Sequence, residues 1–162
     1  MDKTIQIIRE INSEKEIVIC AEIMSSSDPW ITLGITKKEM IRTLNDPLLE
    51  IFVVENDNEI IGTFVLQTKG AFTGYLKSIA IKENWRGKNL GEFMMDFIEK
   101  RIFAGSPNVF LCVSSFNKKA QKFYSKLGYE KVGLLKNYVI QGHDEILMRK
   151  TKGPILSKTV NF

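Results

Sequence analysis

The chain has 162 residues, of which 44% are hydrophobic and 26% charged, and a formal net charge of +4. That length suits one well-buried domain rather than two, and the composition is that of an ordinary globular protein. Lys and Arg are spread along the chain instead of gathering on one element, which argues against nucleic-acid binding.

The first elements are predicted from hydrophobic spacing and turn chemistry. Residues 5–9 are predicted to form a short strand, and residues 13–24 a helix with apolar side chains at helical spacing. Ser, Asp and Pro make residues 25–29 a loop. Thr36 caps a second helix, with Glu39 completing a capping box, and this helix is expected to end near residue 44.

The middle of the chain is rich in strands. Residues 50–55 and 60–66 are predicted to pair as an antiparallel hairpin around a turn at residues 56–58. Residues 75–81 form a third strand of this group. The remaining expected elements are a long helix at 90–102, a strand at 109–113, a helix at 117–127 closed by Gly128, and strands at 131–140 and 145–149.

This order of elements predicts an α/β fold with a mixed sheet. Two strand–helix–strand units in the second half imply some parallel pairing, with helices on both faces of the sheet. We expect one domain over residues 1–150, followed by a poorly ordered tail from Thr151. No long apolar run follows the N-terminus, so we expect neither a secretory signal nor a membrane span.

Cysteine and histidine are scarce. Cys20 and Cys112 are the cysteines and His143 is the one histidine, so no metal-ligand pattern can be assembled and no metal is expected. A single disulfide could be drawn between the cysteines, but nothing indicates an oxidising compartment, and the cytoplasm is the default location.

Residues 81–92 form a basic, glycine-containing loop between a predicted strand and a predicted helix. Unpaired N–H groups and the helix dipole make such a helix start attractive to phosphate. Gly87 and Gly91 allow close approach of the backbone, and Arg86 and Lys88 add cationic donors. The alternative is a basic turn that caps a surface helix. The spacing fits neither a Walker loop nor the dinucleotide fingerprint.

This loop resembles the pyrophosphate-binding loop of the GCN5-related N-acetyltransferases, Arg/Gln-x-x-Gly-x-Gly/Ala after the fourth strand. Arg86, Leu90 and Gly91 match. Asn89 stands where the family usually has glycine, and Asn tolerates the left-handed region better than most residues. The residues that the resemblance assigns to the pyrophosphate are Arg86, Gly87, Lys88, Asn89, Leu90, Gly91 and Glu92.

A second motif occupies residues 117–129. Asn117 is a good N-cap, and Gly128 ends the helix. Taken alone, Tyr124 is most simply a half-buried aromatic. The full pattern, Asn-x-x-Ala-x-x-Phe-Tyr-x-x-x-Gly-Tyr after a strand, resembles the second conserved segment of the same family. The resemblance is good over residues 50–150 and weaker, in element order only, before that.

The resemblance implies a fold and a cofactor site. The fold is a mostly antiparallel sheet of six to seven strands, splayed between the fourth and fifth, here residues 75–81 and 109–113. Acetyl-CoA lies in that gap, with its pantetheine arm paired to the backbone at Ile79, Ala80 and Ile81, where an amide also stabilises the oxyanion. Asn117 would contact the pantetheine or the departing sulfur.

The implied activity is direct acetyl transfer to a primary amine of a small molecule or peptide. Tyr124 is the expected general acid, since a phenol bonded to the sulfur can protonate the leaving thiolate. Cys112 is a rival nucleophile, but a structural cysteine is the better interpretation. Protein N-terminal alanine acetyltransferases carry a glutamate where this chain has Cys112, which argues against a ribosomal-protein-type substrate.

The general base and the acceptor stay open. Glu50, Asp28 and His143 are candidate bases, each more often a surface group. Asp28 and Trp30 could hold a cationic amine by charge and cation–π contact, although Trp30 is more simply a side chain that pins its loop. A CoA-binding regulatory or scaffold domain without catalysis is the alternative function. The resemblance also implies that a homodimer is expected.

Overall fold

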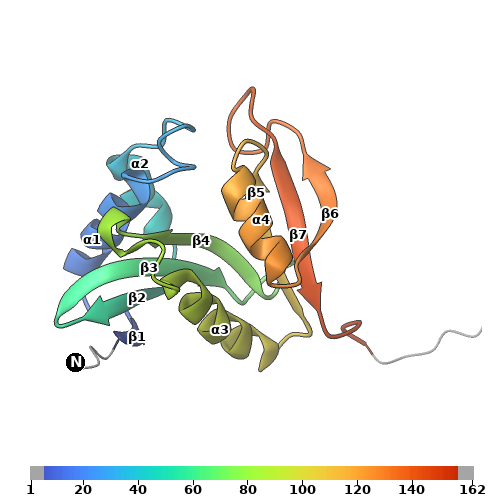
Figure 1. Cartoon of the computed structure of the whole chain (residues 1–162), viewed down its shortest axis with the longest axis horizontal. Coiled ribbons are helices and arrows are strands. Elements are labelled where there is room, and N and C mark those ends of the chain that lie inside the picture. Colours follow the sequence, from blue (N-terminus) through green and yellow to red (C-terminus); the bar gives the residue numbers. More distant parts are fainter. Residues whose placement is uncertain (1–5, 157–162) are drawn as a thin grey trace, which may run out of the picture.

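The structure is a computed structural model that describes residues 6–156 (Figure 1). Within these residues seven strands form one sheet in the order β1-β2-β3-β4-β5-β7-β6. The strands are β1 (Gln6–Glu10), β2 (Glu50–Asn56), β3 (Glu59–Gln67), β4 (Tyr75–Ile81), β5 (Asn108–Ser114), β6 (Glu130–Leu135) and β7 (Glu145–Thr151). The helices are α1 (Glu14–Ser25), α2 (Lys37–Leu44), α3 (Leu90–Phe103) and α4 (Lys118–Lys126).

Local sequence signals set the helix starts. Thr36 Oγ1 accepts the Glu39 N–H at 3.3 Å, and the Glu39 carboxylate accepts the Thr36 N–H at 2.9 Å, which completes the predicted capping box of α2. Asn117 caps α4 by accepting the Ala120 N–H at 3.1 Å. These caps are confirmed, and most predicted helix and strand boundaries agree with the structure within two residues.

Two hydrophobic clusters hold helices on opposite faces of the sheet. The cluster with α1 and α2 includes Val53, Val65 and Ala80 from the strands, and we call that side the α1/α2 face. The cluster with α3 and α4 includes Leu76, Leu111 and Met148, among others, and defines the α3/α4 face. Because successive strand residues point to opposite faces, these clusters fix the face of every residue on β5 and β7.

The sheet opens between β4 and β5. These strands run parallel, but their register covers only Tyr75↔Phe110 and Leu76↔Leu111. The β3–β4 register shifts at the same place, leaving Lys77 as an extra residue on β4. Such a bulge bends a strand, and β4 and β5 diverge beyond it, as Figure 1 shows. The predicted splay between the fourth and fifth strands is therefore confirmed.

Some strand predictions were wrong in detail. The strand predicted over residues 131–140 ends at Leu135, because Asn137 adopts a left-handed φ of 51° and its side chain accepts the Gly142 N–H at 2.8 Å. Thr151, where the tail was expected to begin, is the last residue of β7. Ile5, the first residue of the first predicted strand, lies outside the described residues.

Candidate functional site

The gap between β4 and β5 leaves one edge of β4 without a strand partner among the described residues. Ile79, Ala80 and Ile81 pair with β3 on one side, opposite Phe64, Thr63 and Gly62 respectively. On their other side the parallel register has already ended. The free edge therefore offers N–H and C=O groups that an extended ligand can pair with.

The loop after β4 exposes a row of backbone amides. Gly87 and Asn89 have left-handed φ angles of 73° and 59°. Asn89 thus adopts the left-handed conformation that asparagine tolerates better than most residues. The first bond into α3 runs from the Phe93 N–H to the Asn89 carbonyl at 3.1 Å. Among the described residues, no backbone acceptor is bonded to the amides of residues 87–92. These amides lie at the start of a 14-residue helix, an arrangement that can receive an anion.

The two basic side chains of this loop are engaged differently. The Arg86 guanidinium donates to Ser27 Oγ at 2.8 Å and to the Ile81 carbonyl at 3.1 Å. It therefore ties the α1–α2 connection to the end of β4, a link between residues 59 apart in sequence. The Lys88 ammonium lies 4.8 Å from the centre of the Trp85 ring and stays exposed beside the amides.

Gly91 sets the distance between the loop and α4. A Cβ atom at this position would lie 3.2 Å from Cζ of Phe123 on α4. That is tighter than ordinary van der Waals contact, so the two motifs identified in the sequence pack against each other. The structure thus brings the Arg86–Glu92 segment and the 117–129 segment to the same end of the gap.

Tyr124 lies on α4 with 6% of its surface exposed. The centre of its ring lies 5.3 Å from the ring centre of Phe123 and 5.8 Å from that of Tyr129. Burial raises the pKa of the Tyr124 phenol above its usual value, so the hydroxyl keeps its proton at neutral pH. Asn117, at the start of the same helix, uses its side-chain oxygen for the cap and keeps its amide group for other contacts.

Beside the gap, the α1/α2 face carries the pair Glu145 and Ser114, which sequence reasoning missed. Glu145, the first residue of β7, is 5% exposed and accepts a 2.6 Å hydrogen bond from Ser114 Oγ on β5. Cys112 lies on the same face one step back along β5. Burial raises the pKa of the Cys112 thiol, which makes it a poor nucleophile. The alternation of Ile146 and Met148 was the one signal that could have placed Glu145 on this face.

The candidate bases and acceptor contacts named from the sequence are spread out. Glu50 is bonded to Thr68 and paired with Arg101 at 2.8 Å, and His143 packs on Phe116 with ring centres 5.2 Å apart. Asp28 is exposed and accepts the Thr32 hydroxyl at 2.7 Å.

Trp30 is half-buried against the α1 and α2 cluster, as expected of a side chain that pins its loop. Asp28 and Trp30 thus have local structural roles in the same connection. That connection joins α1 to α2 and also contains Ser27, the partner of Arg86.

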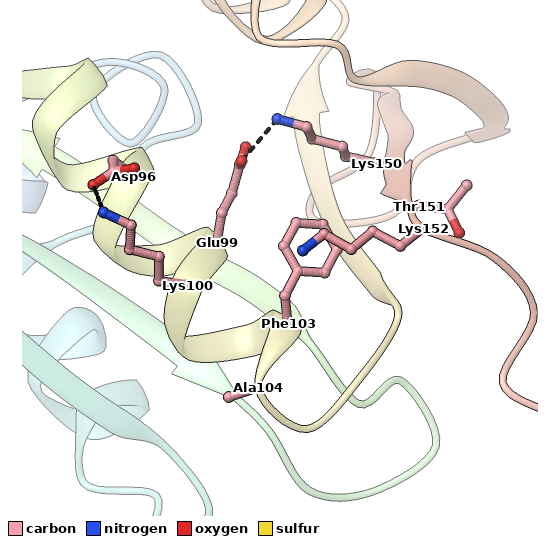
Figure 2. Close-up of a pocket in the computed structure, with 8 residues that line it drawn as sticks. All are labelled: Asp96, Glu99, Lys100, Phe103, Ala104, Lys150, Thr151 and Lys152. Carbon is pink, nitrogen blue, oxygen red and sulfur yellow. Dashed lines mark hydrogen bonds and ion pairs between the residues drawn. The ribbon is translucent and has the colours of Figure 1, made fainter.

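Two hollows of the surface lie away from this gap. The one in Figure 2, about 440 Å³, lies between α3 and the end of β7, where Lys150 pairs with Glu99 and Lys100 with Asp96. The other, about 500 Å³, lies near the start of β5 and is lined in part by Phe110 and Arg149. In residues 6–156 no group of three or more His, Cys, Asp or Glu side chains could hold a metal ion, and no helix there is long and apolar enough to cross a membrane.

Comparison with known proteins agrees with this architecture. Residues 12–129 match the model of the Acetyltransferase (GNAT) family. An uncharacterised N-acetyltransferase of Methanocaldococcus jannaschii is 32% identical over 111 residues, which cover 65% of this chain and 70% of that protein. An N-alpha-acetyltransferase of Sulfurisphaera tokodaii is 28% identical over 110 residues, which cover 60% of this chain and 66% of that protein.

A GNAT acetyltransferase from Elizabethkingia anophelis, solved with acetyl-CoA bound, shares the fold. Its TM-score is 0.70 at 20% identity, over 90% of this chain and 97% of that one. The family match covers most of the described residues, including both motifs and the opened strands. This chain is a member of the GNAT acetyltransferase family.

Proposed function

We propose that the protein transfers the acetyl group of acetyl-CoA directly to a primary amine, and that the α-amine of a peptide is its acceptor. The observation that carries the proposal is the parting of β4 and β5 toward the amide cradle, with Tyr124 buried on the adjoining helix. The acceptor class is suggested by the relative described as an N-alpha-acetyltransferase.

The chain offers binding partners for the pantetheine arm and the pyrophosphate of acetyl-CoA. The free edge of β4 at Ile79–Ile81 pairs with the amides of the pantetheine arm, and the amides of residues 87–92 receive the pyrophosphate. Lys88 adds positive charge there. The Arg86 guanidinium already donates to Ser27 and to the Ile81 carbonyl. We therefore assign Arg86 two roles: it holds the α1–α2 connection against the end of β4, and it adds positive charge near the phosphate.

Acetyl transfer in this site needs no covalent enzyme intermediate. The neutral amine nitrogen attacks the acetyl carbonyl carbon, and a β4 amide stabilises the oxyanion that forms. The C–S bond then breaks, the thiolate takes the proton of the Tyr124 hydroxyl, and the nitrogen gives up a proton as the amide forms. Burial keeps the phenol protonated until that moment. Because a phenol is a weaker acid than a free thiol, whose pKa is about 8.5, the transfer is completed when the nitrogen's proton returns through water to the Tyr124 phenolate.

Peptide acetylation tests this proposal directly. Tetrapeptides with each of the twenty residues at the free N-terminus would be incubated with acetyl-CoA and the protein, and products would be followed by mass spectrometry. We expect a mass gain of one acetyl group on a subset of these peptides and none on the same peptides with a blocked α-amine. Acetylation of lysine side chains alone would contradict the α-amine assignment. A cytoplasmic location and a homodimer stay predictions.

Asn89 offers a test of the phosphate cradle. Its left-handed φ of 59° is open to glycine but strained for a β-branched side chain. We expect Asn89→Gly to bind acetyl-CoA within about threefold of the wild type. Asn89→Val should bind about 5–30-fold more weakly, because a strain of about 1–2 kcal/mol disfavours the loop conformation that forms the cradle. Calorimetric titration measures both, and equal affinity for the Val variant would contradict the cradle.

A further inference from the structure

Glu145 is a buried carboxylate that the proposed transfer step has not used. Its side chain belongs to the first residue of β7, and only 5% of the residue is exposed. Ser114, its register partner on β5, donates a 2.6 Å hydrogen bond to it. Burying a carboxylate costs free energy that a neutral side chain would not, and buried titratable groups cluster at functional sites.

The position of Glu145 relates it to the gap. Val109, Leu111 and Val113 of β5 pack on the α3/α4 face, so Cys112 and Ser114 point to the other face, and Glu145 lies there too. The β4–β5 register ends at Leu111. Ser114 therefore lies on the part of β5 that has separated from β4, and Glu145 lies beside it on β7.

The other groups around Glu145 come from each neighbouring element. On β5 these are Ser114 and Cys112, on β4 the hydroxyl of Tyr75, and on the β6–β7 connection His143. The facing residue on β6 is Leu135, which is uncharged. Burial raises the pKa of Glu145, and the Ser114 hydrogen bond and the nearby His143 oppose this rise. The carboxylate is thus a stronger proton acceptor than an exposed glutamate.

We propose that Glu145, oriented by Ser114, is the general base that takes a proton from the acceptor amine, directly or through one water molecule. The inference rests on the proposed acetyl transfer. The amine enters as R–NH₃⁺ and gives one proton to the Glu145 carboxylate. The nitrogen lone pair then forms the C–N bond as the C–S bond breaks, and Tyr124 protonates the thiolate from the α3/α4 side. The nitrogen gives up its second proton as the amide forms, and this proton returns through water to the Tyr124 phenolate.

This assignment separates the two proton transfers in space. Tyr124 packs in the α3/α4 cluster, whereas Glu145 lies on the α1/α2 face, the side on which Arg86 ties the α1–α2 connection to the end of β4. Base and acid therefore reach the thioester from opposite faces of the sheet. Glu50 and Asp28, the carboxylates considered from the sequence, are instead occupied by Arg101 and Thr32.

The test compares Glu145→Gln with the wild type across pH, using an N-terminal tetrapeptide accepted by the wild type. At pH 7 we expect kcat to fall by about 10²-fold, in line with loss of a general base. The deficit should shrink toward pH 9, because a peptide α-amine has a pKa of about 8 and deprotonates there without help. In the wild type, activity should persist below pH 8 until the raised pKa of Glu145 is passed.

The controls exclude a structural explanation. Glu99→Gln removes a carboxylate paired with Lys150 at 2.7 Å on the opposite face, and its kcat should match the wild type at every pH. Glu145→Gln keeps the shape and can still accept from Ser114, so its melting temperature at pH 8 should equal or exceed that of the wild type. Ser114→Ala removes a hydrogen bond that lowers the pKa of Glu145, so the acid limb of the kcat–pH profile should move to higher pH. Ser114→Thr keeps the hydroxyl and should restore the wild-type profile.

Each outcome decides a claim. A pH-independent loss in Glu145→Gln, or unchanged kcat at pH 7, overturns the role of Glu145 and leaves the proposed transferase standing. Absence of acetylated peptide with the wild type overturns the proposed function and Glu145 with it. A loss confined to low pH, with Glu99→Gln unaffected, supports the base.

Discussion

Replacing Tyr124 with Phe should lower the rate of acetyl transfer by about 10²–10³-fold and leave acetyl-CoA affinity within about twofold. The substitution deletes one oxygen from a ring that is 6% exposed and packed on Phe123 and Tyr129, so the fold of α4 should not change. Only the proton for the departing thiolate is lost. Steady-state kinetics and calorimetry on the same preparation measure the two effects separately.

Tyr129→Phe is the matched control. Tyr129 is also buried, its ring centre lies 5.8 Å from that of Tyr124, and the carboxylate near its hydroxyl is that of Glu99 on α3. The proposed transfer does not use this hydroxyl, so removing it should leave turnover unchanged. If both variants lost activity equally, packing of the two rings would be the cause, and Tyr124 would not be the acid. Turnover by Tyr124→Phe at the wild-type rate would remove the assignment outright.

Tyr124→Phe also separates catalysis from the alternative of a CoA-binding scaffold. A scaffold would bind acetyl-CoA in both forms and transfer acetyl groups in neither. A transferase loses turnover only in the variant. The two functions therefore differ already in the wild-type control of the same experiment.

Gly74→Ala should destabilise the protein by about 2–5 kcal/mol, the largest stability effect that we expect from a single added methyl group. Gly74 has a φ of 89°, and its Cβ would collide with the Asn108 carbonyl and lie 2.7 Å from Cγ2 of Ile102. The conformational cost is about 1–2 kcal/mol and the overpacking adds about 1–3 kcal/mol. Thermal unfolding should shift down by roughly 5–20 °C.

The matched control for this prediction is Gly70→Ala. Gly70 precedes β4 in the same connection and has a similar φ of 99°, but its nearest neighbour is the Gln67 amide at 3.5 Å. Gly70→Ala should lower the free energy of unfolding only by the conformational cost, about 1–2 kcal/mol. Equal destabilisation of the two variants would show that the contact of Gly74 with the start of β5 is not tight. That contact, with the Phe110 N–H bonded to the Gly74 carbonyl at 2.9 Å, joins β4 to β5 where the gap begins.

Local signals in the sequence predicted the elements well because each boundary has a local cause. The capping box at Thr36, the N-cap at Asn117 and the hairpin turn at residues 56–58 depend on neighbours within four residues. The same reasoning predicted a strand too long at residues 131–140. Asn137 and Gly142 interrupt that strand by turn chemistry that hydrophobic spacing alone does not reveal.

The candidate site depended on contacts between distant residues, which the sequence could not reveal. The bond from Arg86 to Ser27 spans 59 positions, and no periodicity predicts it. Glu145 resembled an ordinary polar residue at a strand start, because its burial depends on β7 lying between β5 and β6. The two strand–helix–strand units predicted some parallel pairing, which the parallel pair β4 and β5 confirms. They did not reveal that β7 lies between β5 and β6 and pairs antiparallel with both.

The most direct test of the account is calorimetric titration of the purified protein with acetyl-CoA and with CoA. Saturable binding at a stoichiometry of about one per chain, weakened in Asn89→Val and unchanged in Tyr124→Phe, is the result that the account predicts. Absence of binding by either compound would contradict it, because neither the amide cradle at residues 87–92 nor the parted edge of β4 would then hold the ligand for which we have proposed them.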